Sequence, residues 1–215
     1  MTTQTRSMSS VTPKRIAVAQ LCTTSDKVAN LVGMAKCAGW SMASKSHMMF
    51  LPEACGFLGQ SAAETYANAE PSLSKRTNAI INPEWLTNLL TDTVKSCAEG
   101  KFNKDPEQEA PDYSQEAENM QDISILEGLR TIARASGMFI SVGGLHVQVE
   151  DKDDHRVYNT HLILDEKGGI QAEYRKIHLF DVSIPGQVQL RESNSTAPGR
   201  AAVLCESPIG KKLVV

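Results

Sequence analysis

Three charged residues follow apolar segments of the sequence, at positions where α/β folds present functional groups. Glu53 comes after Phe50-Leu-Pro, Lys176 comes after a strand-like segment, and Glu192 follows a Pro-Gly turn. A carboxylate beside a hydrophobic wall is desolvated, and desolvation raises its pKa toward that of a useful general base. An ammonium group at a strand end can stabilise a developing oxyanion. The residue types therefore predict a base at Glu53 and an electrophilic cation at Lys176.

Each of the three also has a simpler interpretation when it is considered alone. Glu53 can be a surface glutamate after a strand, and Glu192 can be a solvated loop carboxylate. Lys176 can be an exposed lysine, and the neighbouring Arg175 would supply a cation equally well. A metal site is the competing enzyme hypothesis, but the spacing of its candidate ligands matches no compact zinc pattern. We therefore expect no metal bound by these candidates, which are His146, His155, His161, His178, Asp165 and Asp181.

The sequence before Glu53 predicts two buried strands with a helix between them. Apolar residues occupy both faces of segments 15–21 and 47–51, and Pro52 ends the second segment. Between these segments, an apolar stripe with a helical period predicts a helix that is capped by Thr24 or Ser25 and ends near Ser44.

After residue 121 the sequence predicts one more helix and a series of strands. The helix begins at Asp122 and ends at Gly137. Strands are predicted over 138–146, 157–164 and 169–174, with a turn at 165–168. This order of strands and helices indicates an α/β or α+β fold, in which helices cover the faces of a sheet.

Composition excludes several classes of function. The chain has 215 residues and a formal net charge of −3, so its charge favours neither nucleic acid nor an anionic membrane. No apolar run approaches the roughly 18 to 20 residues of a membrane span. Five scattered cysteines without a CxxC pair are typical of reduced thiols. We expect a cytoplasmic protein whose first 14 residues form a flexible segment. The alternative is import into mitochondria, because this segment is rich in Ser and Thr and lacks acidic residues.

The acidity of the chain comes from one segment, 77–121. This segment contains nine acidic residues and three lysines, whereas the rest of the chain has a net charge of +3. Within it, a short helix is predicted over 83–90 with Asn82 as its N-cap. Residues 102–121 have no apolar period and are predicted to form a solvated loop. We interpret 77–121 as an acidic insert within a single domain.

Four motifs together resemble the nitrilase, or carbon–nitrogen hydrolase, superfamily. They are Phe50-Leu-Pro-Glu53, Tyr174-Arg-Lys-Ile-His-Leu-Phe-Asp181, Ile184-Pro-Gly186 and Glu192-Ser-Asn194. The matching segments, 15–76 and 122–192, follow the order of the family. The nearest resemblance is to the branch that includes deaminated-glutathione amidase and omega-amidase. It implies an α-β-β-α sandwich, of which residues 15–215 would form the N-terminal portion.

The resemblance also implies a mechanism that uses no metal and no organic cofactor. In the family, a cysteine thiolate attacks the carbon of a small amide or nitrile, and water then cleaves the thioester. By resemblance, Glu53 is the general base, Lys176 stabilises the oxyanion and Glu192 supports the site. The implied partners are a small-molecule amide substrate and further copies of the complete family member, with no nucleic acid and no membrane.

The family's nucleophile is the feature that this sequence does not match. In the family it follows the position of Glu192, at the end of a strand and in a context like Cys-Tyr-Asp. Here residues 209–215 resemble the strand that precedes that cysteine in the family. Cys205 comes before this strand, and we expect it to lie in a variable loop. Cys55 is expected to be a small buried thiol. We therefore expect no nucleophile among the five cysteines and an incomplete domain. Two hypotheses stay open: an amidohydrolase with a Glu-Lys-Cys mechanism, or an inactive fragment that acts at most through assembly with full-length subunits.

Overall fold

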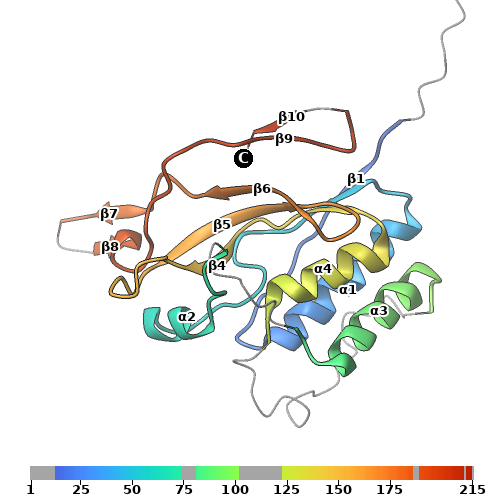
Figure 1. Cartoon of the computed structure of the whole chain (residues 1–215), viewed down its shortest axis with the longest axis horizontal. Helices are drawn as coiled ribbons and strands as arrows, with labels where there is room; N and C mark the ends of the chain where they lie inside the picture. The colour runs from blue at the N-terminus through green and yellow to red at the C-terminus, as the bar shows by residue number, and fades with distance from the viewer. Residues whose placement is uncertain (1–12, 74–80, 102–122, 186–188, 211, 215) are drawn as a thin grey trace, which may run out of the picture.

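The structure is a computed structural model of the chain, and it describes residues 13–73, 81–101, 123–185, 189–210 and 212–214 (Figure 1). The loop predicted over 102–121 and most of the N-terminal segment predicted over 1–14 lie outside these residues. None of the helices in the described ranges is long and apolar enough to cross a membrane.

A mixed sheet forms the centre of the described structure. Its first three strands are parallel and lie side by side in the order β1 (Ile16–Val18), β2 (Met48–Phe50) and β3 (Phe139–Ser141). The long strand β5 (Val157–Leu164) pairs antiparallel with β3 and β4 (Leu145–Gln148) and, separately, with β6 (Ile170–Arg175). Gly168 has a φ of +77° in the tight turn between β5 and β6, where the sequence predicts a turn.

The parallel strands are shorter than the sequence predicts, and β1 is less buried. Val18 of β1 is 78% exposed, because β1 has only one neighbour, β2, among the described strands. The apolar character of segment 15–21 predicted a buried strand, and that prediction is wrong for the described residues.

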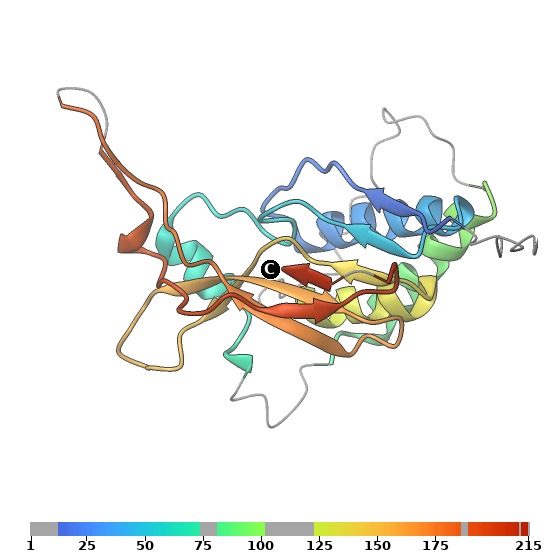
Figure 2. The ribbon, with the colours of Figure 1, turned by 90° about the horizontal axis from the view of Figure 1, so that it is seen from above.

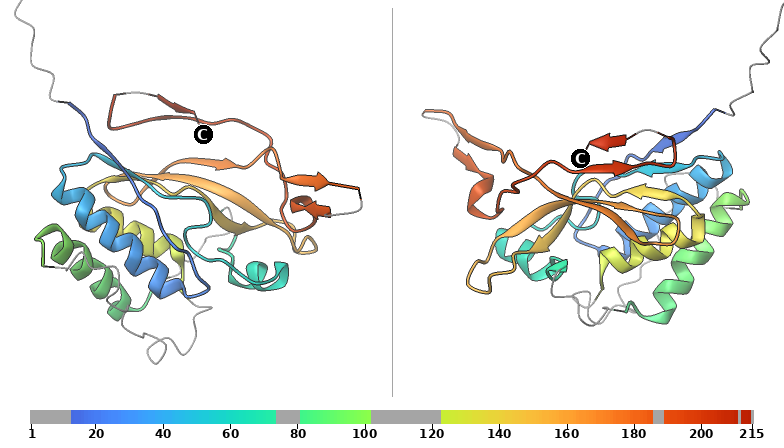
Figure 3. Two further views of the ribbon diagram at one scale, coloured as in Figure 1. Left: turned by 180° about the vertical axis from the view of Figure 1, so that it is seen from behind. Right: turned by 45° about the horizontal axis from the view of Figure 1, so that its top comes forward.

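Helices α1 (Lys27–Ala43), α3 (Glu84–Ala98) and α4 (Ile125–Ser136) pack together on one side of the sheet (Figures 1 and 3). The predicted cap of the first helix is wrong by one to two residues, and the predicted start of the last helix at 122 is wrong by three. Helix α1 begins after Asp26, whose carboxylate accepts a hydrogen bond from Ala29 N at 2.9 Å, and α4 begins after Ser124, whose hydroxyl caps Glu127 N. The predicted end at Gly137 is confirmed by its left-handed φ of +63°.

Part of the acidic segment forms a helix of the core. Helix α3 is longer than the helix predicted over 83–90, and Pro83 rather than Asn82 occupies its N-cap position. Its apolar stripe (Leu86, Leu90, Val94 and Cys97) is buried against α1 and α4, while its acidic residues lie outside this stripe. The charge of segment 81–101 is therefore the solvated face of a packed helix.

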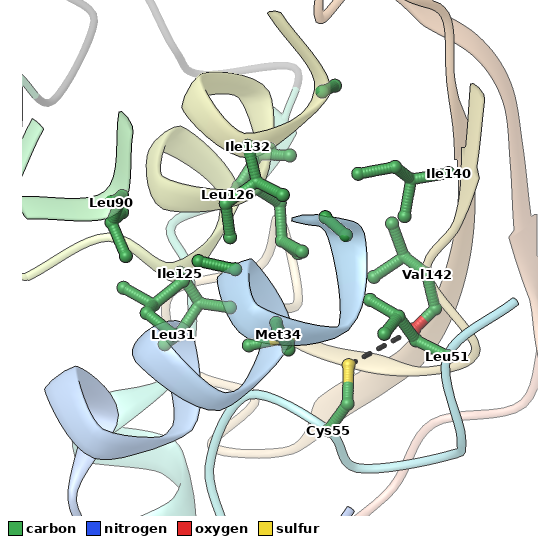
Figure 4. Close-up of a cluster of buried hydrophobic side chains, with 14 of the residues drawn as sticks. Leu31, Met34, Leu51, Cys55, Leu90, Ile125, Leu126, Ile132, Ile140 and Val142 are labelled. Carbon is green, nitrogen blue, oxygen red and sulfur yellow. Dashed lines mark hydrogen bonds between the residues drawn. The ribbon is translucent and has the colours of Figure 1, made fainter. Parts of the chain in front are cut away.

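The apolar core has two parts, one on each side of the sheet. The larger part lies between the helices and the sheet, and Figure 4 shows its centre around Leu31, Met34, Leu126 and Ile140. The smaller part lies on the opposite face and contains Met48, Ile163, Ala172 and Cys205. Cys205 belongs to β9 (Leu204–Glu206), which pairs with β10 (Lys212–Val214), so its predicted place in a variable loop is wrong.

Two small elements complete the fold. Helix α2 (Ala62–Asn68) is capped by the hydroxyl of Ser61, which accepts a hydrogen bond from Glu64 N at 3.1 Å. Strands β7 (Asp181–Ser183) and β8 (Gln189–Arg191) form a two-stranded ladder that projects from one end of the sheet (Figure 2). The predicted α/β class, with helices covering a sheet face, is confirmed by this arrangement.

Candidate active site

A break in the strand predicted over 138–146 creates the wall of the site. The segment bends at Gly143, whose φ is +78°, so that β3 and β4 pair with different halves of β5. A Cβ atom on Gly143 would lie 2.3 Å from the carbonyl oxygen of Pro52. The loop that follows β2 therefore lies directly against this bend, and only glycine permits the approach.

Glu53 is carried by that loop. Leu51 N donates a hydrogen bond to Ser141 O at 2.9 Å, which ties the end of β2 to β3. Ala54 has a positive φ of 55°, an unfavourable conformation for a residue with a Cβ atom. The Glu53 side chain lies over Gly144, where an added Cβ would be 3.3 Å from Glu53 Cγ. Backbone geometry therefore fixes where the Glu53 side chain leaves the sheet.

Lys176 directly follows β6, and backbone hydrogen bonds hold it on two sides. Its N–H donates to Asn159 O at 2.9 Å, and its carbonyl accepts from Gly199 N at 2.8 Å. Its ammonium nitrogen Nζ lies 3.2 Å from Glu53 Oε1 and also 3.2 Å from Glu192 Oε1. The structure thus brings together all three residues that the sequence selected. Lys176 is 123 positions from Glu53 and 16 positions from Glu192 in the sequence.

Glu192 begins a short 3₁₀ turn, η3 (Glu192–Asn194), after β8. Its second oxygen, Oε2, accepts a hydrogen bond from Phe180 N at 2.6 Å, just before β7. The Glu192 side chain is only 20% exposed, whereas that of Glu53 is 60% exposed. Glu192 therefore links Lys176 to the base of the β7–β8 ladder, while Glu53 faces the open side of the site.

The pKa of Glu53 is shifted in the opposite direction to the prediction from sequence. Partial burial does act to raise it, as expected, but hydrogen bonds from Asn159 and Lys176 outweigh burial and hold the pKa below its ordinary value. The apolar strand before Glu53 indicates burial, but nothing in that segment indicates these two donors. Glu53 is therefore ionised at neutral pH and can accept a proton.

The pKa of Lys176 is raised above its ordinary value. Partial burial acts to lower it, but the hydrogen bonds to Glu192 and Glu53, and the charges of both carboxylates, outweigh that effect. Lys176 is therefore an ammonium ion at neutral pH. A fixed cation beside an ionised carboxylate is the arrangement that acyl transfer needs for a base next to an oxyanion stabiliser.

Two further residues lie beside Glu53: Asn159, which was missed in the sequence, and His146, which was considered only as a metal ligand. Asn159 Nδ2 donates to Glu53 Oε1 at 2.5 Å from the middle of β5. His146 stands opposite Asn159 in the β4–β5 register; burial lowers its pKa, and the charges of Glu53 and Glu192 oppose that effect. Asparagine is uncommon in strands, so an Asn inside the apolar segment 157–164 was the signal that could have marked it.

Three of the five cysteines, Cys55, Cys97 and Cys205, are buried thiols, and Cys37 is half-buried. Cys55 is fully buried, its Sγ contacts Val142 O at 3.2 Å, and burial raises its pKa to about 12 (Figure 4). Burial also raises the pKa of Cys37, Cys97 and Cys205. Cys22, which is exposed, lies in the segment before α1. A raised pKa disfavours the thiolate, which is the reactive form.

The histidines and aspartates proposed as alternative metal ligands do not form a cluster. Within the described ranges, no group of three or more His, Cys, Asp or Glu residues is placed to hold a metal ion. His161 Nε2 lies 2.8 Å from Ser141 Oγ, and the ring of His155 packs edge-on against Tyr66. These histidines have structural contacts of their own.

Substrate space at the site is open rather than enclosed. The hollow behind Ala54, Gly144 and His146 has a volume of about 10 Å³, enough for about one water molecule. Larger hollows of about 380 and 400 Å³ lie elsewhere on the surface and include none of Glu53, Lys176 and Glu192. In the described residues, Glu53 and Lys176 therefore form one wall of a site that is open on its other side.

Comparison with known proteins identifies the family. Residues 15–215 match the family model described as carbon-nitrogen hydrolase. The chain belongs to the carbon–nitrogen hydrolase family. Deaminated glutathione amidase of Homo sapiens is 30% identical over 195 residues, which cover 90% of this chain and 44% of the relative. The resemblance inferred from the sequence motifs is thereby confirmed.

Solved structures of carbon–nitrogen hydrolases share the fold. The Caenorhabditis elegans NitFhit protein aligns with a TM-score of 0.59 and 25% identity over 93% of this chain and 37% of that one. Saccharomyces cerevisiae Nit3, a member of the nitrilase superfamily, aligns with a TM-score of 0.54 and 20% identity over 93% of this chain and 53% of that one. The predicted nitrilase-type fold is confirmed. The chain spans less than half the length of the curated relatives that it matches first.

Proposed function

We propose that Glu53, Lys176 and Glu192 form the base and the oxyanion-stabilising part of an amidohydrolase site. The substrate is a small carboxamide or a deaminated peptide such as deaminated glutathione. The observation that carries this proposal is the position of Lys176 Nζ, 3.2 Å from a carboxylate oxygen of both glutamates. The substrate class is supported by relatives named deaminated glutathione amidase in Homo sapiens and Dictyostelium discoideum.

The proposed reaction follows the charges of the site. Glu53 accepts the proton of a thiol, the sulfur bonds to the amide carbon, and the carbonyl electron pair moves to oxygen beside the Lys176 ammonium. The C–N bond then breaks as Glu53 returns its proton to the leaving nitrogen. Glu53 next removes a proton from water, the hydroxide displaces the sulfur from the thioester, and the proton returns to the thiol. Glu192 keeps Lys176 at the oxyanion position throughout.

The thiol in this proposal is not one of the five cysteines of the chain. Cys55, the nearest to Glu53 in sequence, is buried and its pKa of about 12 leaves almost no thiolate at neutral pH. We propose that the thiol comes from polypeptide outside these 215 residues, either continuous with them or in an assembled subunit. The burial of three cysteines, Cys55, Cys97 and Cys205, also supports the second candidate function, a chain that is inactive by itself and acts through assembly.

The test measures hydrolysis by the protein purified from the cells that naturally produce it, by means of an N-terminal tag. This purification retains any polypeptide that continues the chain or is assembled with it. Release of amine and carboxylate from deaminated glutathione is compared with that of Glu53→Gln and Lys176→Met variants. We expect kcat to fall at least about a hundredfold in both, because each removes a group that acts in the transition state.

Matched controls are Glu166→Gln and Lys167→Met, which change the same residue types on the exposed β5–β6 turn. Both controls should hydrolyse the substrate at the unaltered rate. Unaltered hydrolysis by Glu53→Gln and Lys176→Met would exclude the proposed roles. The 215-residue chain produced alone should release no product, and turnover that is lost in Cys55→Ala or Cys205→Ala would show that the thiol is internal.

A further inference from the structure

One strand residue contacts both charged partners of the site. Asn159 Nδ2 donates a hydrogen bond to Glu53 Oε1 at 2.5 Å, while the carbonyl of the same residue accepts the N–H of Lys176 at 2.9 Å. Asn159 lies within β5, which is paired on both edges and is the most central strand of the antiparallel part of the sheet. The contact spans 106 residues of sequence.

The two oxygens of the Glu53 carboxylate are in different environments. Oε1 accepts hydrogen bonds from both Asn159 Nδ2 and Lys176 Nζ, whereas Oε2 accepts none from the described residues. A carboxylate oxygen with two donors has fewer lone pairs available for a further proton. Oε2 is therefore the oxygen that is free to accept a proton from a bound group.

We propose that Asn159 is a positioning residue, which holds Glu53 by Oε1 so that Oε2 faces the substrate and carries the proton in the reaction. This inference rests on the proposed function, in which Glu53 is the base. Asn159 acts through Glu53 and need not touch the substrate. Lys176 alone cannot hold the Glu53 carboxylate in place. Its ammonium group also donates to Glu192, and during the reaction it donates to the oxyanion.

Both side chains lie against Gly144, and the hydrogen bond between them orients the Asn159 amide. A Cβ atom added to Gly144 would lie 2.6 Å from Asn159 Oδ1 and 3.3 Å from Glu53 Cγ, so both side chains rest directly on this glycine. If the amide turned over, Oδ1 would face the Glu53 carboxylate, oxygen against oxygen, and the hydrogen bond would be lost. The hydrogen bond to Glu53 therefore sets the orientation of the amide, and Gly144 leaves room for the two side chains beside each other.

The decisive variant is Asn159→Ala, and its matched control is Gln171→Ala. Gln171 Nε2 also donates to a carboxylate, Asp165 Oδ2, at 2.6 Å, but on the far turn of the same hairpin. The control therefore removes an amide–carboxylate hydrogen bond of similar length outside the site. Asn159→Asp is the third variant, because it keeps the size of the side chain and replaces the donor with an acceptor.

Two measurements are made on each variant. The first is the titration of the Glu53 carboxyl carbon by NMR in the 215-residue chain, which needs no activity. Because the Asn159 hydrogen bond lowers the pKa of Glu53, we expect this pKa to rise in Asn159→Ala, to rise further in Asn159→Asp, and to stay unchanged in Gln171→Ala.

The second measurement is the pH dependence of kcat in the active protein purified from its own cells. We expect kcat of Asn159→Ala to fall about tenfold to a hundredfold, with the acid limb moved to higher pH and with KM little changed. Gly144→Ala, which crowds both side chains, should lower kcat in the same way. Gln171→Ala should keep the original profile.

The outcomes separate this inference from the proposed function. If the active protein hydrolyses no amide, the proposed function fails, and the NMR titration still decides whether Asn159 holds Glu53. If hydrolysis depends on Glu53 but Asn159→Ala leaves kcat, its acid limb and the Glu53 titration unchanged, the positioning role is overturned. An equal loss in Asn159→Ala and Gln171→Ala would likewise overturn it, because a general weakening of the hairpin would then explain the effect.

Discussion

Replacing Lys176 by methionine separates the stability of the site from its chemistry. The substitution keeps an unbranched side chain of similar length and removes the charge that lies between Glu53 and Glu192. Since each Oε1 is 3.2 Å from Nζ, the two oxygens are at most about 6.4 Å apart. Two carboxylates then face each other without their common cation.

The cost in stability is small because the site is open. Glu53 is 60% exposed and Lys176 is 30% exposed, so each ion pair contributes about 0.2 to 1 kcal/mol. Repulsion between two carboxylates about 6.4 Å apart adds about 0.6 kcal/mol in bulk water. We therefore expect Lys176→Met to lower the free energy of unfolding by about 1 to 2 kcal/mol, and to lower kcat by a hundredfold to a thousandfold, about 2.7 to 4 kcal/mol.

The effect on stability has a defined pH range. Hydrogen bonds raise the pKa of Lys176 despite its partial burial, so its contribution is complete below pH 10.5 and is lost as the pH rises through the folded-state pKa. The pKa of Glu53 is lowered, so its contribution is present above pH 4.5 and is lost as the pH falls through the folded-state pKa. The difference between the original chain and Lys176→Met should therefore be constant between these limits and shrink outside them.

Urea unfolding between pH 3 and 11 measures this difference, and the hydrolysis assay measures kcat, with Lys167→Met as the control in both. A loss of more than about 4 kcal/mol, or a loss that does not depend on pH, would show that Lys176 is part of the core and would refute the estimate from its exposure. Normal hydrolysis by Lys176→Met would refute the oxyanion role.

Three further predictions concern the core and the cysteines. Gly39→Ala should lower the free energy of unfolding by about 1 to 3 kcal/mol, since its Cβ would lie 2.5 Å from the backbone oxygen of Val94 in α3. Gly128→Ala, whose Cβ would lie 2.5 Å from the buried Leu31 side chain, should lower it less, because a side chain moves aside more easily than a backbone atom; urea unfolding measures both. Iodoacetamide should alkylate exposed Cys22 first and buried Cys55 last, as followed by peptide mass spectrometry; early labelling of Cys55 would contradict its burial. Glu70→Ala should lower the free energy of unfolding, measured with urea, by about 2 kcal/mol, because the Glu70 carboxylate accepts hydrogen bonds from the Ser124 hydroxyl and from Leu126 N at the start of α4.

The sequence predicted most of the elements because their signals are local. The apolar stripe and the glycine at 137 located α4, and the strand predicted over 157–164 matches β5 to the residue. The errors also have local causes. Asp26 and Ser124 compete with nearby polar residues as caps, and the apolar segment 138–146 resembles one strand unless the two glycines are understood as a bend.

The residues of the candidate site could be selected from the sequence, whereas its electrostatics could not. Glu53, Lys176 and Glu192 could be selected because each follows an apolar segment and belongs to a family motif, and both signals are short stretches of sequence. The direction of the Glu53 pKa shift depends instead on Asn159, which is 106 residues away and contributes through a single hydrogen bond. Burial can be inferred from neighbours in sequence, but the donors that reach a carboxylate come from whichever strands the fold places beside it. A sequence motif can therefore select a candidate base, whereas the pKa of that carboxylate is a property of the tertiary structure.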